Sequence, residues 1–110
     1  MSLSYTWQKL SAAVDALAEG DYPQWQRLAA AMVMIEPLRR TGRSASDFPT
    51  PELRQRFDAL QDRLSACGSF EDTIKTLGVI EISESIREIL KLYEEVAKAI
   101  GVEEAEGRTR

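Results

Sequence analysis

The chain of 110 residues contains no histidine and a single cysteine, Cys67. Without an imidazole it cannot form a Ser-His-Asp or Cys-His nucleophile, a histidine-ligated zinc or iron site, or a phosphorelay histidine. With one cysteine it cannot form an internal disulfide, a multi-cysteine zinc site or an iron–sulfur cluster of its own. We therefore expect no catalytic residues, no metal ligands and no cofactor.

Long hydrophobic runs and glycine-rich phosphate loops are also missing. No segment has the roughly 18 consecutive apolar residues of a membrane span, and Met1–Ser4 place no basic residue ahead of an apolar stretch. The glycines are isolated rather than spaced as in a nucleotide-binding loop. We predict a protein with no membrane partner, and the free thiol of Cys67 favours the reducing cytoplasm.

The charge balance is acidic, with 18 acidic and 14 basic side chains and a formal net charge of -4. No segment is strongly basic, so nucleic-acid binding is not expected. Hydrophobic residues make up 44% of the chain, which is enough for one core. We predict a single helical domain over residues 1–102 and a flexible tail over residues 103–110, where Ala105 is the one apolar residue.

Hydrophobic periodicity predicts an all-α bundle of four to five helices that begins with an antiparallel helical hairpin. The first helix is expected to end at Gly20, and Asp21 with Gln24 resembles a capping box that starts the second. The short connection between them favours antiparallel packing. The first helix carries its apolar residues on one stripe: Leu3, Trp7, Leu10, Val14 and Leu17.

The second helix is apolar on every face from Ala29 to Ile35, which indicates burial on more than one side. Pro37 lacks the N–H that would bond the carbonyl of Val33, so this helix kinks or ends there. We predict a kink, with Gly42 as the end of the helix.

The remaining helices are predicted from their end signals. Thr50 and Pro51 mark the start of a helix that is expected to reach Gly68. Ser69, with an acidic residue three positions later, marks a short helix that is expected to end at Gly78.

The last helix is the least sharply bounded. Val79–Ile82 has the composition of a brief extended segment, and the helix is predicted to begin at Ser83 or Ser85. Ser85 and Glu88 have the spacing of a capping box. The apolar stripe that follows is expected to end at Gly101.

Carboxylate pairs at helical spacing, Asp58 with Asp62 and Glu84 with Glu88, resemble pairs that hold magnesium in some bundles. Both pairs are interleaved with basic residues at outward positions, so we interpret them as solvated surface. Cys67 follows the apolar stripe of its helix and is predicted to pack in the core or at its edge.

The strongest functional signal is surplus apolar surface on the first hairpin. Aromatic residues and flexible methionines are typical of surfaces that bind partner helices. The same residues would equally serve as plain core, and both uses stay open. The candidate partner-binding residues are Trp7, Trp25, Met32 and Met34.

Residues 17–28 read LAEGDYPQWQRL and lead into an apolar helix that ends in EPLRR. This stretch resembles the first hairpin of the flagellar type III export chaperones, of the kind that holds the filament-cap protein. The resemblance covers about half of the chain and implies a small, acidic, all-helical, cytoplasmic bacterial protein that binds a client protein. It assigns no role to individual residues, because Gly68 and Gly78 interrupt the long third helix of that family.

Together these patterns favour a non-catalytic protein-binding module, an adaptor or an export-chaperone-like protein, that binds another protein or a second copy of itself. The alternative is a small acidic antitoxin, immunity or anti-defence inhibitor that masks a basic site. An enzyme would have to work with arginine and carboxylates alone, and no such constellation is recognisable. The inhibitor alternative rests on the acidic C-terminal half: Glu81, Glu84, Glu88, Glu94 and Glu95.

Overall fold

A computed structural model describes residues 3–38 and 48–108, with side chains described over 5–38 and 48–101. This part of the chain folds into five helices and no strand, as the hydrophobic periodicity predicts. The prediction of an all-α bundle is therefore confirmed. The helices are α1 (Leu3–Leu17), α2 (Gln24–Ile35), α4 (Pro51–Leu64), α5 (Phe70–Lys75) and α6 (Val79–Arg108).

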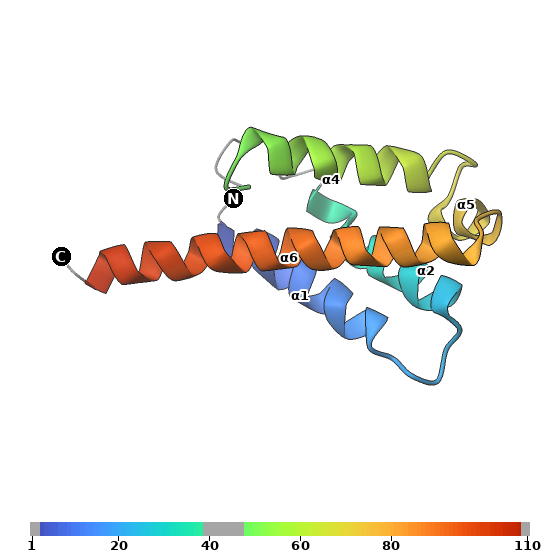
Figure 1. Cartoon of the computed structure of the whole chain (residues 1–110), viewed down its shortest axis with the longest axis horizontal. Coiled ribbons are helices and arrows are strands. Elements are labelled where there is room, and N and C mark those ends of the chain that lie inside the picture. Colours follow the sequence, from blue (N-terminus) through green and yellow to red (C-terminus); the bar gives the residue numbers. More distant parts are fainter. Residues whose placement is uncertain (1–2, 39–47, 109–110) are drawn as a thin grey trace.

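The helix α6 is the longest element, with 30 residues, and it runs along the long axis of the molecule. The α1–α2 hairpin lies on one side of it and α4 on the other, while α5 closes the end at which α6 begins (Figure 1). The hairpin is antiparallel, as predicted, and its two helices pack closely. The guanidinium of Arg27 donates a hydrogen bond of 3.0 Å to the Leu17 carbonyl and thus ties the start of α2 to the end of α1.

The core lies where α1, α2 and α4 face α6. Residues of α6 at spacings of three and four, among them Ile89, Leu92 and Val96, have no exposed surface. Across from them, Leu10 of α1 and Phe57 of α4 are equally buried. This arrangement follows from amphipathic helices that bury one stripe each.

Two predicted helix starts are confirmed in atomic detail. The Thr50 side chain accepts a hydrogen bond of 3.2 Å from the Leu53 amide, with Pro51 at the first helical position of α4. The Ser69 side chain accepts a bond of 3.1 Å from the Asp72 amide at the start of α5. Gly68 precedes Ser69 with φ of 102°, a conformation that costs glycine little and other residues much.

The predicted start of α2 and the predicted end of α4 are wrong in detail. The helix α2 begins at Gln24 after Pro23, with no side-chain cap, so Asp21 does not form the expected capping box. Its regular helix ends at Ile35, Glu36 is a turn residue, and Pro37 and Leu38 are helical again. The helix is therefore interrupted beside Pro37, which has no N–H for the next helical bond, and the chain continues in helical conformation to the last residue described there. The predicted end at Gly42 lies outside the described residues. Similarly, α4 ends at Leu64, and residues 65–68 form turns.

The predicted start and end of α6 are also wrong. Val79–Ile82 forms the first helical turn rather than an extended segment, and the Ile82 amide donates to the Gly78 carbonyl at 3.0 Å. Ser85 lies inside the helix, where its hydroxyl donates to the Glu81 carbonyl at 2.9 Å, so it is not a cap.

The helical backbone continues past Gly101 to Arg108. A single glycine inside a helix costs only about 1 kcal/mol relative to alanine, and the residues after it include good helix formers. The predicted division into a domain over 1–102 and a flexible tail over 103–110 stays a prediction.

The N-cap of α4 provides a test of this fold. Thr50→Ala removes the hydrogen bond to the Leu53 amide and is expected to lower the free energy of unfolding by about 1 kcal/mol, as measured by urea denaturation. Gln55→Ala, at an exposed position of the same helix, is the matched control and should change stability by less than about 0.5 kcal/mol. Equal effects of the two substitutions would contradict the capping role.

Candidate interaction surface

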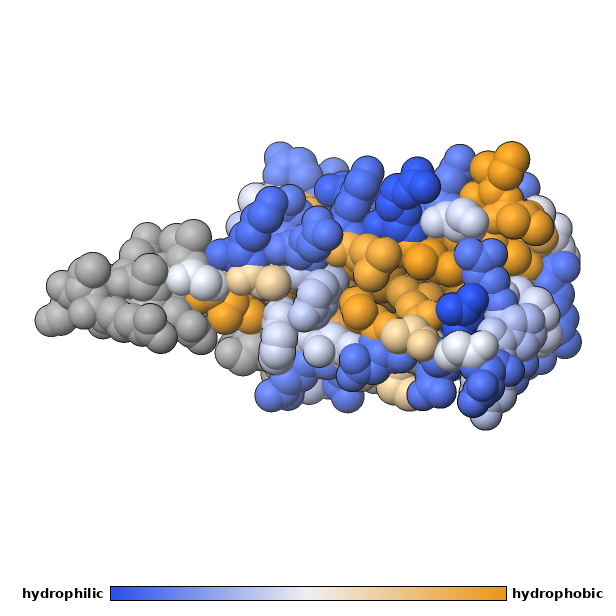
Figure 2. All heavy atoms as spheres, turned by 60° about the horizontal axis from the view of Figure 1, so that its bottom comes forward, coloured by the Kyte–Doolittle hydropathy of each residue, from blue (hydrophilic) through white to orange (hydrophobic). Residues whose placement is uncertain are grey.

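The helix α2 is buried on one side and carries exposed apolar residues, beside the polar Gln26, on the other. Met32 and Ile35 have no exposed surface, whereas Val33 is 55% exposed and Met34 is 43% exposed. Ala30, one turn before, is exposed as well. Figure 2 shows hydrophobic side chains gathered across the middle of the face on which the α1–α2 hairpin lies. The outer face of α2 is thus an apolar surface that no described part of the chain covers.

A groove of about 700 Å³ runs along one side of this face, between α2, the end of α4 and the start of α5. Trp25 and Phe70 contribute aromatic surface to it, and both are only partly buried. The Lys75 ammonium lies 5.1 Å from the centre of the Trp25 ring, a cation–π contact that holds the ring beside α5. The residues that line this groove include Trp25, Ala29, Val33, Gln61, Ser65 and Phe70.

Gln61 is an unusual member of this lining. Its side chain has no exposed surface, and neither Oε1 nor Nε2 has a hydrogen-bond partner in the described part of the chain. A buried amide without partners costs about 1–3 kcal/mol relative to a paired one. The groove therefore contains a polar group that the fold leaves unsatisfied.

A second, smaller groove of about 350 Å³ lies on the other side of the α2 face, against the end of α1. Tyr22, which is 50% exposed, and Met34 line it. Gln26 and Ala30 line both grooves. The outer face of α2 is therefore a ridge between two grooves, and we call the whole surface the α2 ridge.

The structure does not bring the four predicted partner-binding residues together. Trp7 lies on α1 and stacks on Tyr93 of α6, with ring centres 6.2 Å apart and an interplanar angle of 26°. Met32 is core. Trp25 and Met34 do lie on the α2 ridge, one in each groove. Half of the predicted set is thus accessible there and half supports the fold.

Val33, Ala30 and Gln61 also belong to this surface and are not among the residues predicted from the sequence. The run Ala29–Ile35 is apolar on every face, so periodicity alone could not separate Met32 from its neighbour Val33. Gln61 stands in the buried stripe of α4, between Leu60 and Leu64. A polar residue at such a position is the signal that could have identified it.

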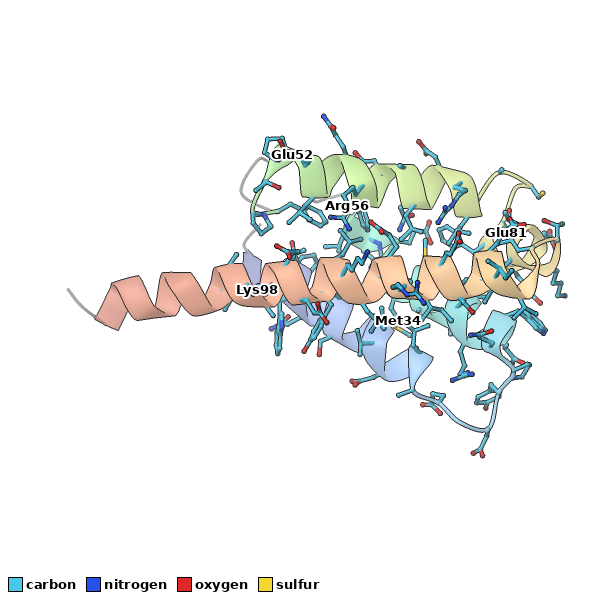
Figure 3. The ribbon with its side chains drawn as sticks, in the orientation of Figure 1. Met34, Glu52, Arg56, Glu81 and Lys98 are labelled. Atoms are coloured by element: carbon cyan, nitrogen blue, oxygen red, sulfur yellow. The ribbon has the colours of Figure 1, made fainter. Side chains whose placement is uncertain are left out.

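Charged residues line a third groove of about 340 Å³ between α4 and α6. Arg56 bonds Glu88 across it at 2.8 Å, and Arg63 donates to the Ser85 hydroxyl at 3.1 Å. The hydrogen bond to Glu88 and the negative charge of Glu88 raise the pKa of Arg56 above its usual value. Figure 3 shows Arg56 between α4 and α6, with Met34 on the other side of α6.

Other polar predictions have mixed outcomes. Arg54 and Asp58 form an ion pair one turn apart on α4, at 3.4 Å. Cys67 is exposed in the turn after α4, which corrects its predicted place in the core or at its edge. Over the residues that the structure describes, no group of three or more acidic or cysteine side chains is placed to hold a metal ion.

Comparisons with protein families, with curated proteins and with solved structures found no match to this chain. Within the described ranges, none of the helices combines the length and the apolar character needed to cross a bilayer.

The contrast between two neighbouring methionines tests the placement of α2. Met32→Ala should lower the free energy of unfolding by about 2–5 kcal/mol, because it leaves a cavity in the core. Met34→Ala serves as the control on the same helix and should change it by less than about 0.5 kcal/mol. Thermal or urea unfolding of the two variants measures both changes in the free energy of unfolding. A larger loss in Met34→Ala than in Met32→Ala would mean that Met34, and not Met32, faces the core.

Proposed function

We propose that this protein is a non-catalytic protein-binding module, an adaptor or export-chaperone-like protein, that binds a helix of another protein across the α2 ridge. One observation carries the proposal: Val33 and Met34 are exposed on a helix whose adjacent residues form the core. Apolar side chains on a surface that is flanked by grooves are typical of sites for partner helices.

The shape of the ridge suits a helix. Ala30 at its crest lacks a bulky side chain, so a partner helix can approach closely, at the 8–10 Å axis separation typical of packed helices. Side chains of the partner would then enter the two grooves on either side. Trp25 in one groove and Met34 in the other offer an aromatic and a flexible contact for them.

The acidic inhibitor is less well supported. Of its acidic residues on α6, Glu88 pairs with Arg56 at 2.8 Å and Glu95 with Lys98 at 3.7 Å. Arg87 and Lys91 are also interleaved among them. The charge of these carboxylates is therefore partly balanced within the chain, which weakens attraction to a basic partner.

Site-specific photo-crosslinking in cells that naturally produce the protein tests this proposal. A photoreactive phenylalanine analogue at Ala30 is expected to give one protein adduct, whose cross-linked peptide mass spectrometry can identify. The same analogue at Gln55, exposed on α4, is the matched control and should not give it. Adding Val33→Asp should reduce the Ala30 adduct about tenfold or more, because a carboxylate without a partner is costly in an apolar interface.

Three results would contradict the proposal. They are no adduct from Ala30, an equal adduct from Gln55, or an Ala30 adduct that Val33→Asp leaves unchanged. An adduct of twice the mass of the chain would identify the partner as a second copy instead of another protein. Circular dichroism of each variant should first show unchanged helix content.

A further inference from the structure

The unpaired amide of Gln61 indicates what the larger groove of the α2 ridge binds. Gln61 has no exposed surface, and its Oε1 and Nε2 have no partner in the described chain. Its backbone is in regular helix, and its own carbonyl accepts the Ser65 hydroxyl at 2.8 Å. The side-chain amide is therefore the part of this residue that the fold does not use.

Polar residues line the same groove, among them Glu36, Ser65 and Ser69, but none of them bonds the side-chain amide of Gln61. Its neighbours in the buried stripe of α4, Phe57, Leu60 and Leu64, are apolar. Across the groove stand Ala29 and Val33 of α2, which are apolar as well. A buried amide without a partner is stabilised most by a ligand that supplies a hydrogen-bonding group.

An amide side chain offers an N–H donor and a C=O acceptor side by side. Another amide with its donor and acceptor in the same arrangement satisfies both through two parallel hydrogen bonds. A primary carboxamide has this arrangement, whereas a carboxylate only accepts and an ammonium only donates. A helix keeps its backbone groups in its own hydrogen bonds, so a partner helix must supply a side chain.

We propose that the larger groove recognises a side-chain carboxamide, from glutamine or asparagine, on the apolar face of the partner helix, through paired hydrogen bonds to Gln61. The inference rests on the proposed function, since it names the chemistry of the partner. Because Gln61 has no exposed surface in the free chain, a groove-lining side chain must shift as the carboxamide enters.

Small aromatic probes test the chemistry without knowledge of the partner. Benzamide carries a primary carboxamide on a ring that suits the Trp25 and Phe70 side of the groove, and acetophenone has nearly the same shape but only accepts. In titrations of ¹⁵N-labelled protein, benzamide should shift the Gln61 side-chain amide resonances in a saturable way. It should bind about tenfold more tightly than acetophenone, which forms one hydrogen bond fewer.

A variant separates recognition from packing. Gln61→Met keeps the length of the side chain and removes both polar groups, so it should raise the midpoint of thermal unfolding by about 4–8 °C. The same variant should bind benzamide and acetophenone equally. It should also weaken the Ala30 adduct, while Gln55→Met, on the exposed side of α4, leaves the adduct, the probes and the midpoint unchanged.

Equal binding of the two probes to the unmodified protein would overturn the proposal, as would benzamide binding that Gln61→Met does not affect. These results are distinguishable from failure of the proposed function. If the Ala30 adduct forms as expected but the probes show no preference, the docking surface stands and carboxamide recognition is wrong. If benzamide binds through Gln61 but no adduct forms, the groove takes a carboxamide and the docking of a partner helix is wrong.

Discussion

The burial of one stripe of α6 is the constraint on which the rest of the structure depends. In the described chain, α6 contacts α1, α2 and α4, and its residues Ile89, Leu92 and Val96 are buried. The α1–α2 hairpin and α4 lie on opposite sides of α6, and each packs against it. A small domain whose single cysteine excludes an internal disulfide gains its stability from such apolar burial.

This constraint also explains why α2 has two apolar faces with different uses. The inner face, with Leu28, Met32 and Ile35, completes the core that α6 organises. The hairpin connection and the hydrogen bond from Arg27 to the Leu17 carbonyl fix the rotation of the helix about its axis. On the outer face, Trp25 and Ala29 are partly buried against the core, whereas Val33 and Met34 are exposed. Residues that the fold does not require are the natural candidates for binding.

Most of the fold could be predicted because its signals are local. Thr50 and Ser69 cap their helices through bonds to residues three positions later, which the sequence alone shows. The same pattern at Ser85 was misleading, since tertiary packing of Ile82 draws the preceding turn into α6 and makes Ser85 an interior residue. Local sequence patterns therefore predict the presence of a helix more reliably than they predict its first residue.

The surface was predictable only in part. The aromatic residues and methionines of the hairpin indicate α2 as a candidate, but the rotation of α2 depends on contacts with α1 and α6 that are distant in sequence. Trp7 and Met32 could therefore not be separated from Trp25 and Met34. Gln61 could not be recognised as unpaired either, because hydrogen-bond partners of a buried side chain depend on the packed structure.

The position of the single thiol has a practical consequence. Cys67 is exposed in the turn that leads into Gly68 and Ser69, two residues that line the larger groove. The 110-residue sequence contains no second cysteine. A maleimide dye will therefore attach at one position, at the rim of the groove and on the unaltered sequence. A change in the fluorescence of this dye would then report the binding of a ligand in the larger groove.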